Sequence, residues 1–179
     1  MFVIQTHNFL SPVTLRKKLQ AETRIPFDGA EIYKVYKKIN TAHYSFISIR
    51  QAGEEQTTTN DLHHCFENIR TISGTQSVSR RHNHLYVINP YYLDTRHYDH
   101  YIRMWDESAA HMENKPGFVR ARLFRTLNEH DKIKLVSIAE WESEEAFLSR
   151  FDSAAFREII APYENIFAIT FNRKMASSL

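Results

Sequence analysis

The amino-acid sequence predicts an α+β protein in which antiparallel strands form a sheet with helices on one face. Between residues 84 and 175, strand-like and helix-like segments follow one another in the order β-α-β-β-α-β. Residues 1–80 show a shorter and less regular pattern of the same kind. The polar stretch SGTQSVSRRHN, residues 73–83, separates the two patterns. We therefore expect two units, at residues 1–80 and 84–175.

The second unit is expected to begin with a strand and a long helix. HLYVIN, residues 84–89, is apolar and rich in β-branched and aromatic residues, and it precedes Pro90. From residue 95 to 114, apolar side chains recur at three- and four-residue steps, which is typical of one helix face. Asp94 or Thr95 can supply the N-cap oxygen, and the NKPG segment ends the helix.

A hairpin, two short helices and a last strand are expected to follow. FVRARLFRTL (118–127) alternates as a half-buried strand, NEHD is a turn, and IKLVSIAEW (133–141) is the returning strand. Ser143 is expected to cap the next helix, because two glutamates follow it in the first turn. The Asp-Ser pair at 152–153 breaks the helical pattern in two, and NIFAITFNR (165–173) reads as the final strand.

The first unit has a similar but incomplete pattern. MFVIQTHNF (1–9) reads as a strand, and AEIYKVYKK (30–38) and HYSFISIRQ (43–51) read as a strand pair. A Ser-Pro pair predicts a short helix over residues 11–22. DLHHCFENIRTI (61–72) is predicted to be a second helix. The residues expected on its apolar face are Leu62, Cys65, Phe66 and Ile69.

The order β-α-β-β-α-β is that of a ferredoxin-like unit. Because helices cover one face of its sheet, the other apolar face requires a second cover. A second sheet would provide it, either from the first half of the same chain, as an intramolecular pseudo-dimer, or from another chain, as a homodimer. The segments THNF (6–9) and VINP (87–90) end the two first strands in a similar way, which favours an internal duplication.

Composition argues against several classes of function. The net charge of +2 and the pI of 8.6 do not indicate a nucleic-acid partner. The four glycines form no phosphate-binding loop. No stretch approaches the roughly 18 apolar residues of a membrane span, so no membrane partner is expected. Cys65 is the only cysteine and cannot form an internal disulfide, so a cytoplasmic protein is expected.

The histidines do not form a metal-binding pattern. His63, His64 and Cys65 are consecutive, so their side chains would diverge around a helix. His100 and His111 would lie about 16 Å apart along one helix at its usual rise. Because no CxxC or HxxxH spacing is present, no metal site is expected.

Four segments together resemble the antibiotic biosynthesis monooxygenase family. They are YVIN (86–89), KPGFVRARLFR (115–125), IAEWESEEAF (138–147) and SAAF (153–156), and the resemblance spans residues 84–172. It implies a dimeric α+β barrel fold built from two ferredoxin-like units. The layout of the whole chain is similar to two-domain members, which include TRAP-like regulators and a haem-degrading branch.

The family contains cofactor-independent oxygenases, haem-degrading enzymes and proteins without known activity. The resemblance implies a monooxygenase-like protein that binds a small aromatic or polycyclic substrate between sheet and helices and oxygenates it without a cofactor. Asn89 would hydrogen-bond the substrate oxygen or dioxygen. The aromatic residues that would hold the ring are Trp105, Phe147, Phe151 and Tyr163.

Other interpretations stay open at this point. Asn89 is also suited to satisfying its own backbone before Pro90, and aromatic residues at helical spacing commonly pack a core. A regulatory or ligand-sensing protein of the same fold is the alternative to an enzyme. A cavity of roughly 300 Å³ or more beside Asn89 would favour ligand binding over a filled core.

Haem binding is disfavoured by a residue comparison. The haem-degrading branch uses an asparagine at the end of the first strand, which Asn89 matches. It uses a tryptophan nine residues after the strand tryptophan, where this chain has Arg150, and a histidine ten residues later, where it has Ile160. Two of the three positions differ, including the iron ligand.

Overall fold

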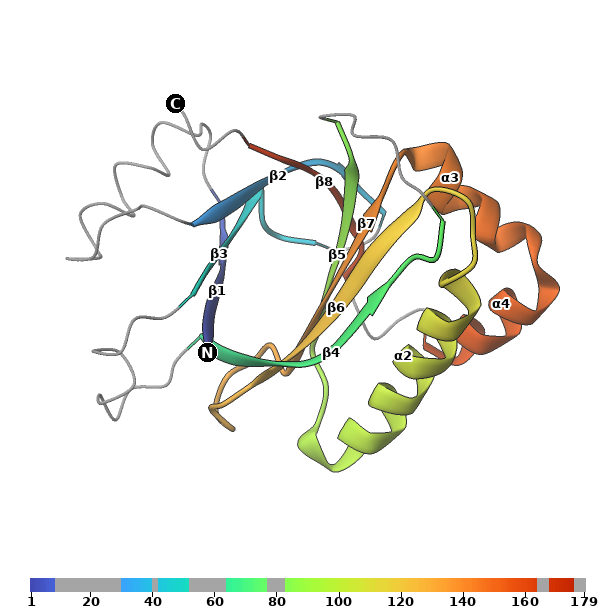
Figure 1. Cartoon of the computed structure of the whole chain (residues 1–179). Helices are drawn as coiled ribbons and strands as arrows, with labels where there is room; N and C mark the ends of the chain where they lie inside the picture. Colours follow the sequence, from blue (N-terminus) through green and yellow to red (C-terminus); the bar gives the residue numbers. More distant parts are fainter. Residues whose placement is uncertain (9–29, 40–41, 52–63, 77–82, 164–167, 176–179) are drawn as a thin grey trace.

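The computed structural model describes residues 1–8, 30–39, 42–51, 64–76, 83–163 and 168–175. Within these ranges eight strands form one closed barrel, and the helices lie along the outside of one side of it (Figure 1). The strands are β1 (Phe2–His7), β2 (Glu31–Lys38), β3 (Phe46–Gln51), β4 (Cys65–Ser73), β5 (Leu85–Tyr91), β6 (Phe118–Thr126), β7 (Leu135–Trp141) and β8 (Thr170–Lys174). The helical segments are η2 (Thr95–His97), α2 (Tyr98–Met112), α3 (Glu144–Leu148), η3 (Ser149–Asp152), α4 (Ala154–Ile160) and η4 (Ala161–Tyr163).

Each half of the chain contributes four strands in the same spatial order. The first half runs β4-β1-β3-β2 and the second runs β8-β5-β7-β6, so both have the strand order of a ferredoxin-like unit. The halves join where β2 pairs with β8 and where β4 pairs with β6. Thus the second strand of each half pairs with the fourth strand of the other, a repeat that supports an internal duplication. The unit boundary expected at residues 73–83 stays a prediction.

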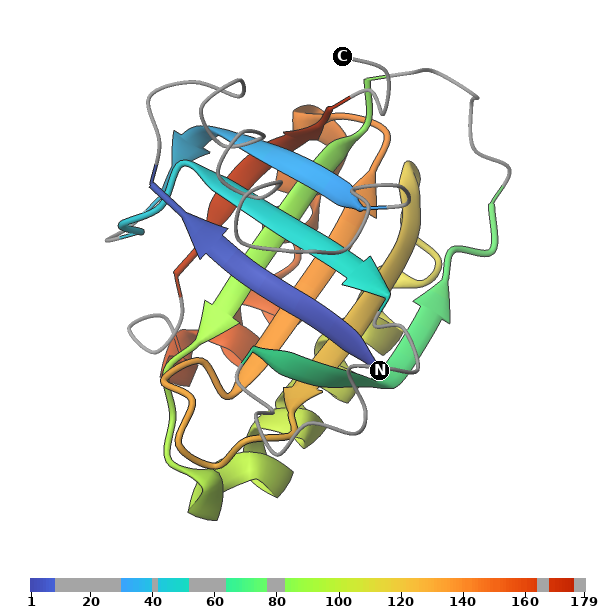
Figure 2. The same ribbon diagram turned by 90° about the vertical axis from the view of Figure 1, so that its left-hand side faces the viewer.

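The two halves cover each other across the barrel interior. Figure 2 shows β1, β3 and β2 lying across the strands of the second half. One cluster of buried side chains fills this interior and includes Ile4 and Ile49 from the first half and Ile88 and Ile138 from the second. The uncovered apolar face expected from the sequence is therefore covered by the other half of the same chain.

A second core lies between the barrel wall and the helices. On β5 the side chains alternate, so that Ile88 faces the interior while Leu85 and Val87 face outward. The outward side chains pack against Met104 and Trp105 of α2 and against aromatic residues of α3 and α4. No helix within the described ranges is long and apolar enough to cross a bilayer.

Local sequence signals place the helices as expected. The side chain of Asp94 accepts a hydrogen bond from the Arg96 backbone N–H at 2.9 Å and begins the helical region. Ser143 accepts from the Ala146 N–H at 3.1 Å and begins α3. Ser153 ends η3 and caps α4, which confirms the predicted break. The expected strands are confirmed, but some of their ends differ from the prediction. Strand β5 continues to Tyr91, and β8 begins at Thr170.

The helix predicted at residues 61–72 is wrong over its described part. Cys65–Ser73 is strand β4, which pairs with β6 along most of its length and with β1 at its start. A register shift between Asn68 and Arg70 disturbs the regular alternation of side chains, so the apolar spacing mimics a helix. Long-range pairing that closes the barrel decides the structure of this segment. Leu62 and the helix predicted at residues 11–22 lie outside the described residues.

A buried carboxylate ties the inner face of the barrel wall together. Glu140 on β7 accepts a hydrogen bond from the Tyr86 hydroxyl at 3.0 Å and from Arg120 Nε at 2.8 Å, and it lies 2.8 Å from His84 Nδ1. Burial acts to raise the pKa of Glu140, but the hydrogen bond with His84 and the charge of Arg120 outweigh it. The pKa of Glu140 therefore lies below its usual value.

This arrangement predicts an acid-dependent contribution to stability. Because the folded pKa of Glu140 lies below the unfolded one, the carboxylate stabilises the fold above pH 4.5, and this stabilisation is lost as the pH falls through the folded value. Replacing Glu140 with glutamine should lower the free energy of unfolding by about 1–2 kcal/mol near neutral pH. Urea titrations at about pH 7 and about pH 3 should show this difference shrinking in acid. A difference that is constant over the whole range would contradict the assignment.

Candidate functional site

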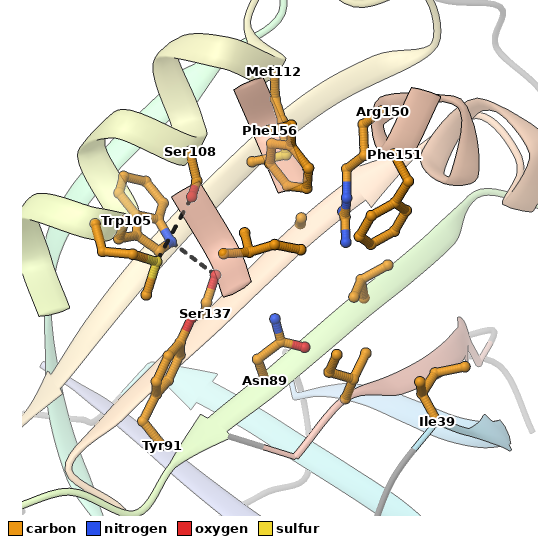
Figure 3. Close-up of a pocket in the computed structure, with 15 residues that line it drawn as sticks. Ile39, Asn89, Tyr91, Trp105, Ser108, Met112, Ser137, Arg150, Phe151 and Phe156 are labelled. Carbon is orange, nitrogen blue, oxygen red and sulfur yellow. Dashed lines mark hydrogen bonds between the residues drawn. The ribbon is translucent and has the colours of Figure 1, made fainter. Parts of the chain in front are cut away.

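A cavity of about 380 Å³ lies outside the barrel, between its wall and the helices (Figure 3). Strands β5 and β7 form its floor, α2 forms one wall, and η3 and α4 form the opposite wall. The apolar and aromatic lining consists of Ile39, Val87, Met104, Trp105, Met112, Ala139, Phe151, Phe156, Ile160 and Ile169. The polar lining consists of Asn89, Tyr91, Ser108, Ser137 and Arg150. Apolar walls with a few polar groups are typical of small-molecule sites.

The structure brings three of the five predicted site residues together at this cavity. Asn89, Trp105 and Phe151 line it. Phe147 does not: it is only 2% exposed and its ring lies beneath the guanidinium of Arg150. The side chain of Tyr163 lies outside the described part of the structure.

Asn89 lies on β5 with its side chain directed into the cavity (Figure 3). Its Oδ1 atom is buried and has no hydrogen-bond partner among the described residues. The strand continues through Pro90 to Tyr91, so Asn89 is not the last residue of its strand. Since the side-chain oxygen does not bond the neighbouring backbone, it is available to a ligand.

A short chain of hydrogen bonds fixes the polar side of the cavity. The Trp105 indole N–H donates to Ser137 Oγ at 2.8 Å, which holds the ring against the wall. Burial raises the pKa of the Tyr91 hydroxyl well above its usual range, although hydrogen bonds with Asn89 and Ser137 act in the opposite direction. Tyr91 is therefore a neutral phenol that positions Asn89 and Ser137.

Arg150 is the unexpected member of the lining. It lies in η3 and is only 8% exposed. Its guanidinium lies over the rings of Phe147, Phe151 and Phe156, at 3.4, 4.5 and 5.0 Å from their centroids. In the sequence, Arg150 stands out only as a mismatch to a haem site. The feature that could have indicated its place in the cavity is a basic residue among aromatic residues at helical spacing.

The second half of the chain matches the model of a known protein family. Residues 85–162 match the model of the antibiotic biosynthesis monooxygenase family. This part of the chain is an antibiotic biosynthesis monooxygenase domain. The cavity lies against this domain, and most of its lining residues come from it. No curated protein sequence matches the chain.

Solved structures with the same overall fold extend over nearly the whole chain. An anthrone oxidase-like protein has a TM-score of 0.61 at 12% identity, covering 99% of this chain and 95% of its own. A major regulator of staphylococcal pathogenesis has a TM-score of 0.55 at 11% identity, covering 98% and 99%. A haem-degrading enzyme from Listeria monocytogenes has a TM-score of 0.56 at 14% identity, covering 96% and 97%. At these identities the likeness establishes the fold alone.

The described lining of the cavity lacks the histidine that the resemblance requires as a haem ligand. Ile160 lines the cavity at the position where the resemblance required a histidine. Among the described residues that line it, none is a histidine or a cysteine, which are common protein ligands of haem iron. The charged Arg150 also occupies one wall. The described lining therefore does not fit haem bound through the histidine that the resemblance requires.

Proposed function

We propose that the monooxygenase domain binds a small aromatic or polycyclic substrate in the cavity and oxygenates it without a cofactor. The observation that carries this proposal is the cavity beside Asn89. Its volume of about 380 Å³ exceeds the threshold expected for ligand binding, and its walls are mostly apolar. A core filled by its own side chains, which was the competing interpretation, would leave no such space.

The residues around the cavity would have distinct roles. The rings of Trp105, Phe151 and Phe156 would hold a flat ligand by apolar contact. Asn89 would donate from its amide N–H group to the substrate oxygen or dioxygen, and its unpartnered Oδ1 atom would accept a hydrogen bond from a hydroxyl group of the ligand. The surrounding helices would limit access of water to the reacting atoms.

The proposed reaction requires only the substrate and dioxygen. An acidic aromatic CH₂ group loses a proton to solvent, and the resulting anion transfers an electron to dioxygen. The two radicals combine to form a peroxide anion, which takes up a proton from solvent to give a hydroperoxide. Loss of water then leaves a carbonyl group. One oxygen atom of dioxygen enters the product and the other leaves as water, so CH₂ and O₂ give C=O and H₂O.

Blocking the cavity tests this proposal. Ser108 lines the cavity from α2, and its hydroxyl donates a weak hydrogen bond to the Met104 sulfur at 3.7 Å. Ser108→Phe should place a ring in the ligand space and lower the affinity for anthrone and its rate of oxygen uptake by about tenfold or more. Ser108→Ala should leave both nearly unchanged. Oxygen-electrode assays with anthrone, together with thermal melts that confirm folding, make the comparison.

Anthrone is a suitable probe because one structure of the same fold is described as anthrone oxidase-like. Anthraquinone and water are the expected products. Binding and oxygen uptake that stay unchanged in Ser108→Phe would contradict the location of the site. Failure of the wild-type protein to consume oxygen with any acidic aromatic substrate would contradict the reaction.

A ligand-sensing protein is the second candidate. Among the described lining residues there is no histidine, aspartate or glutamate that could take a proton from a substrate. The regulator with the same fold is compatible with a binding role. Tight binding of an aromatic ligand without oxygen uptake would favour this candidate.

A further inference from the structure

We propose that Arg150 makes the cavity an oxyanion site, so that the aromatic ligand is bound as a phenolate or carboxylate whose oxygen pairs with the guanidinium. This inference rests on the proposed function, because it requires that the cavity bind a ligand. It adds the charge of the ligand and the residue that selects it. Neither follows from the match to the family model.

Arg150 is a buried cation without a charged partner among the described residues. Arg150 is 8% exposed, and its Nε atom has no hydrogen-bond partner in the described part of the chain. No carboxylate of a described residue forms a salt bridge with it, and among the described residues that line the cavity no other is charged. Buried charges in proteins are normally paired. An anionic ligand would complete this pair.

Aromatic side chains hold the guanidinium of Arg150 in place. Phe147 lies against its face, and Phe151 and Phe156 are close to it. Stacking on rings compensates for part of the lost hydration but uses none of the N–H donors. These donors lie at the edge of the guanidinium, which Figure 3 shows directed toward the cavity space that Asn89 also faces.

The positive charge of Arg150 would also affect the ionisation of a bound ligand. Burial acts to lower the pKa of Arg150, yet a guanidinium stays protonated in proteins. A fixed positive charge in a site of low polarity favours the ionised form of a bound phenol. The phenol proton would pass to solvent, since none of the described lining residues is a histidine, aspartate or glutamate that could accept it. In anthrone, loss of a CH₂ proton gives an anion whose charge lies on the oxygen as a phenolate, so Arg150 would help to generate the anion that the proposed reaction needs.

Two probes of similar shape and different charge test the inference. At neutral pH 2-naphthoate is an anion and 2-naphthamide is neutral. The wild-type protein should bind naphthoate about tenfold to a hundredfold more tightly than naphthamide in calorimetric titrations, because charge-assisted hydrogen bonds are strong. Arg150→Met should abolish this preference while naphthamide binding stays within about threefold.

Arg103→Met is the matched control. Arg103 is an exposed residue of α2, so its replacement makes the same change in net charge away from the lining. This variant should keep the preference for naphthoate. Equal loss of the preference in both variants would show a general effect of charge and would overturn the role of Arg150.

The remaining outcomes separate this inference from the proposed function. If wild-type protein and Arg150→Met bind both probes equally, the oxyanion site is overturned while the ligand cavity stands. If the wild-type protein binds neither probe, both proposals fail.

A measurement on the wild-type protein alone covers the case in which Arg150→Met does not fold. The absorbance of bound 2-naphthol should show a pKa lower than that of free 2-naphthol. An unchanged or raised value would overturn the inference.

Discussion

Replacing Asn89 with leucine should lower kcat for oxygen uptake by about a hundredfold or more, with a much smaller effect on the affinity for 2-naphthamide. A single hydrogen-bond donor at an oxygen that gains charge contributes about this much to a rate. Leucine keeps the approximate shape of asparagine but can neither donate nor accept. Oxygen-electrode kinetics with anthrone and calorimetric binding of naphthamide would separate the effects on rate and on affinity.

The Asn89 prediction has a control in the neighbouring hydroxyl. Asn89 hydrogen-bonds with Tyr91, so its effect could pass through that residue. If Asn89 acts directly on the substrate or on dioxygen, Tyr91→Phe, which removes only a hydroxyl that positions Asn89, should lower kcat much less than Asn89→Leu does. Full activity of Asn89→Leu would show that Asn89 is a structural residue of β5.

Replacing Trp141 with alanine should lower the free energy of unfolding by about 3–5 kcal/mol. Trp141 is the last residue of β7 and has no exposed surface. Its ring packs edge-on against those of Phe118 and Phe147, with ring centroids 5.1 and 5.9 Å apart. The alanine variant leaves a large cavity where the barrel wall meets α3. Urea unfolding followed by tryptophan fluorescence and circular dichroism would measure the loss.

Trp141→Phe is the matched variant. The Trp141 Nε1 atom is buried without a hydrogen-bond partner in the described structure, so removing it leaves no polar group unpaired. We expect this variant to cost only about 1–2 kcal/mol. Because Trp141 does not line the cavity, the folded variant should keep its affinity for naphthamide. A selective loss of binding in a stable Trp141→Phe protein would contradict a purely structural role.

The second half of the fold could be predicted because its local signals agree with its long-range structure. Asp94 and Ser143 cap helices where the sequence places them. Pro116 and Gly117 follow the helix end, and Gly117 adopts a positive φ of 77° that favours glycine. Alternation on β6 and β7 matches a wall with one side toward each core. Each element there is specified by its own residues.

The first half was less predictable because strand β4 depends on distant partners. Its apolar residues fit a helical spacing, and only pairing with β6 and β1 distinguishes the two structures. Closure of the barrel within one chain also depends on strands that are far apart in the sequence, since it requires β2 to pair with β8. Such contacts leave no mark on the local pattern of the sequence.

The candidate site was predictable in its residue types but not in its charge. Asn89 and Trp105 were expected from the resemblance and line the cavity. Phe147 was expected beside them and lies beneath Arg150 instead, because side chains at helical spacing divide between a cavity and the core behind it. The sequence marks Arg150 as a departure from the haem pattern. Its burial, which gives it a role, is visible only in three dimensions.

The most direct test of the account is a crystal structure of the protein with 2-naphthoate. We predict that the rings lie outside the barrel, between Trp105 and Phe151, with the carboxylate against the Arg150 guanidinium and near Asn89. Naphthoate bound inside the barrel or elsewhere on the surface, with the cavity between helices and sheet left without ligand, would contradict the assignment of this site.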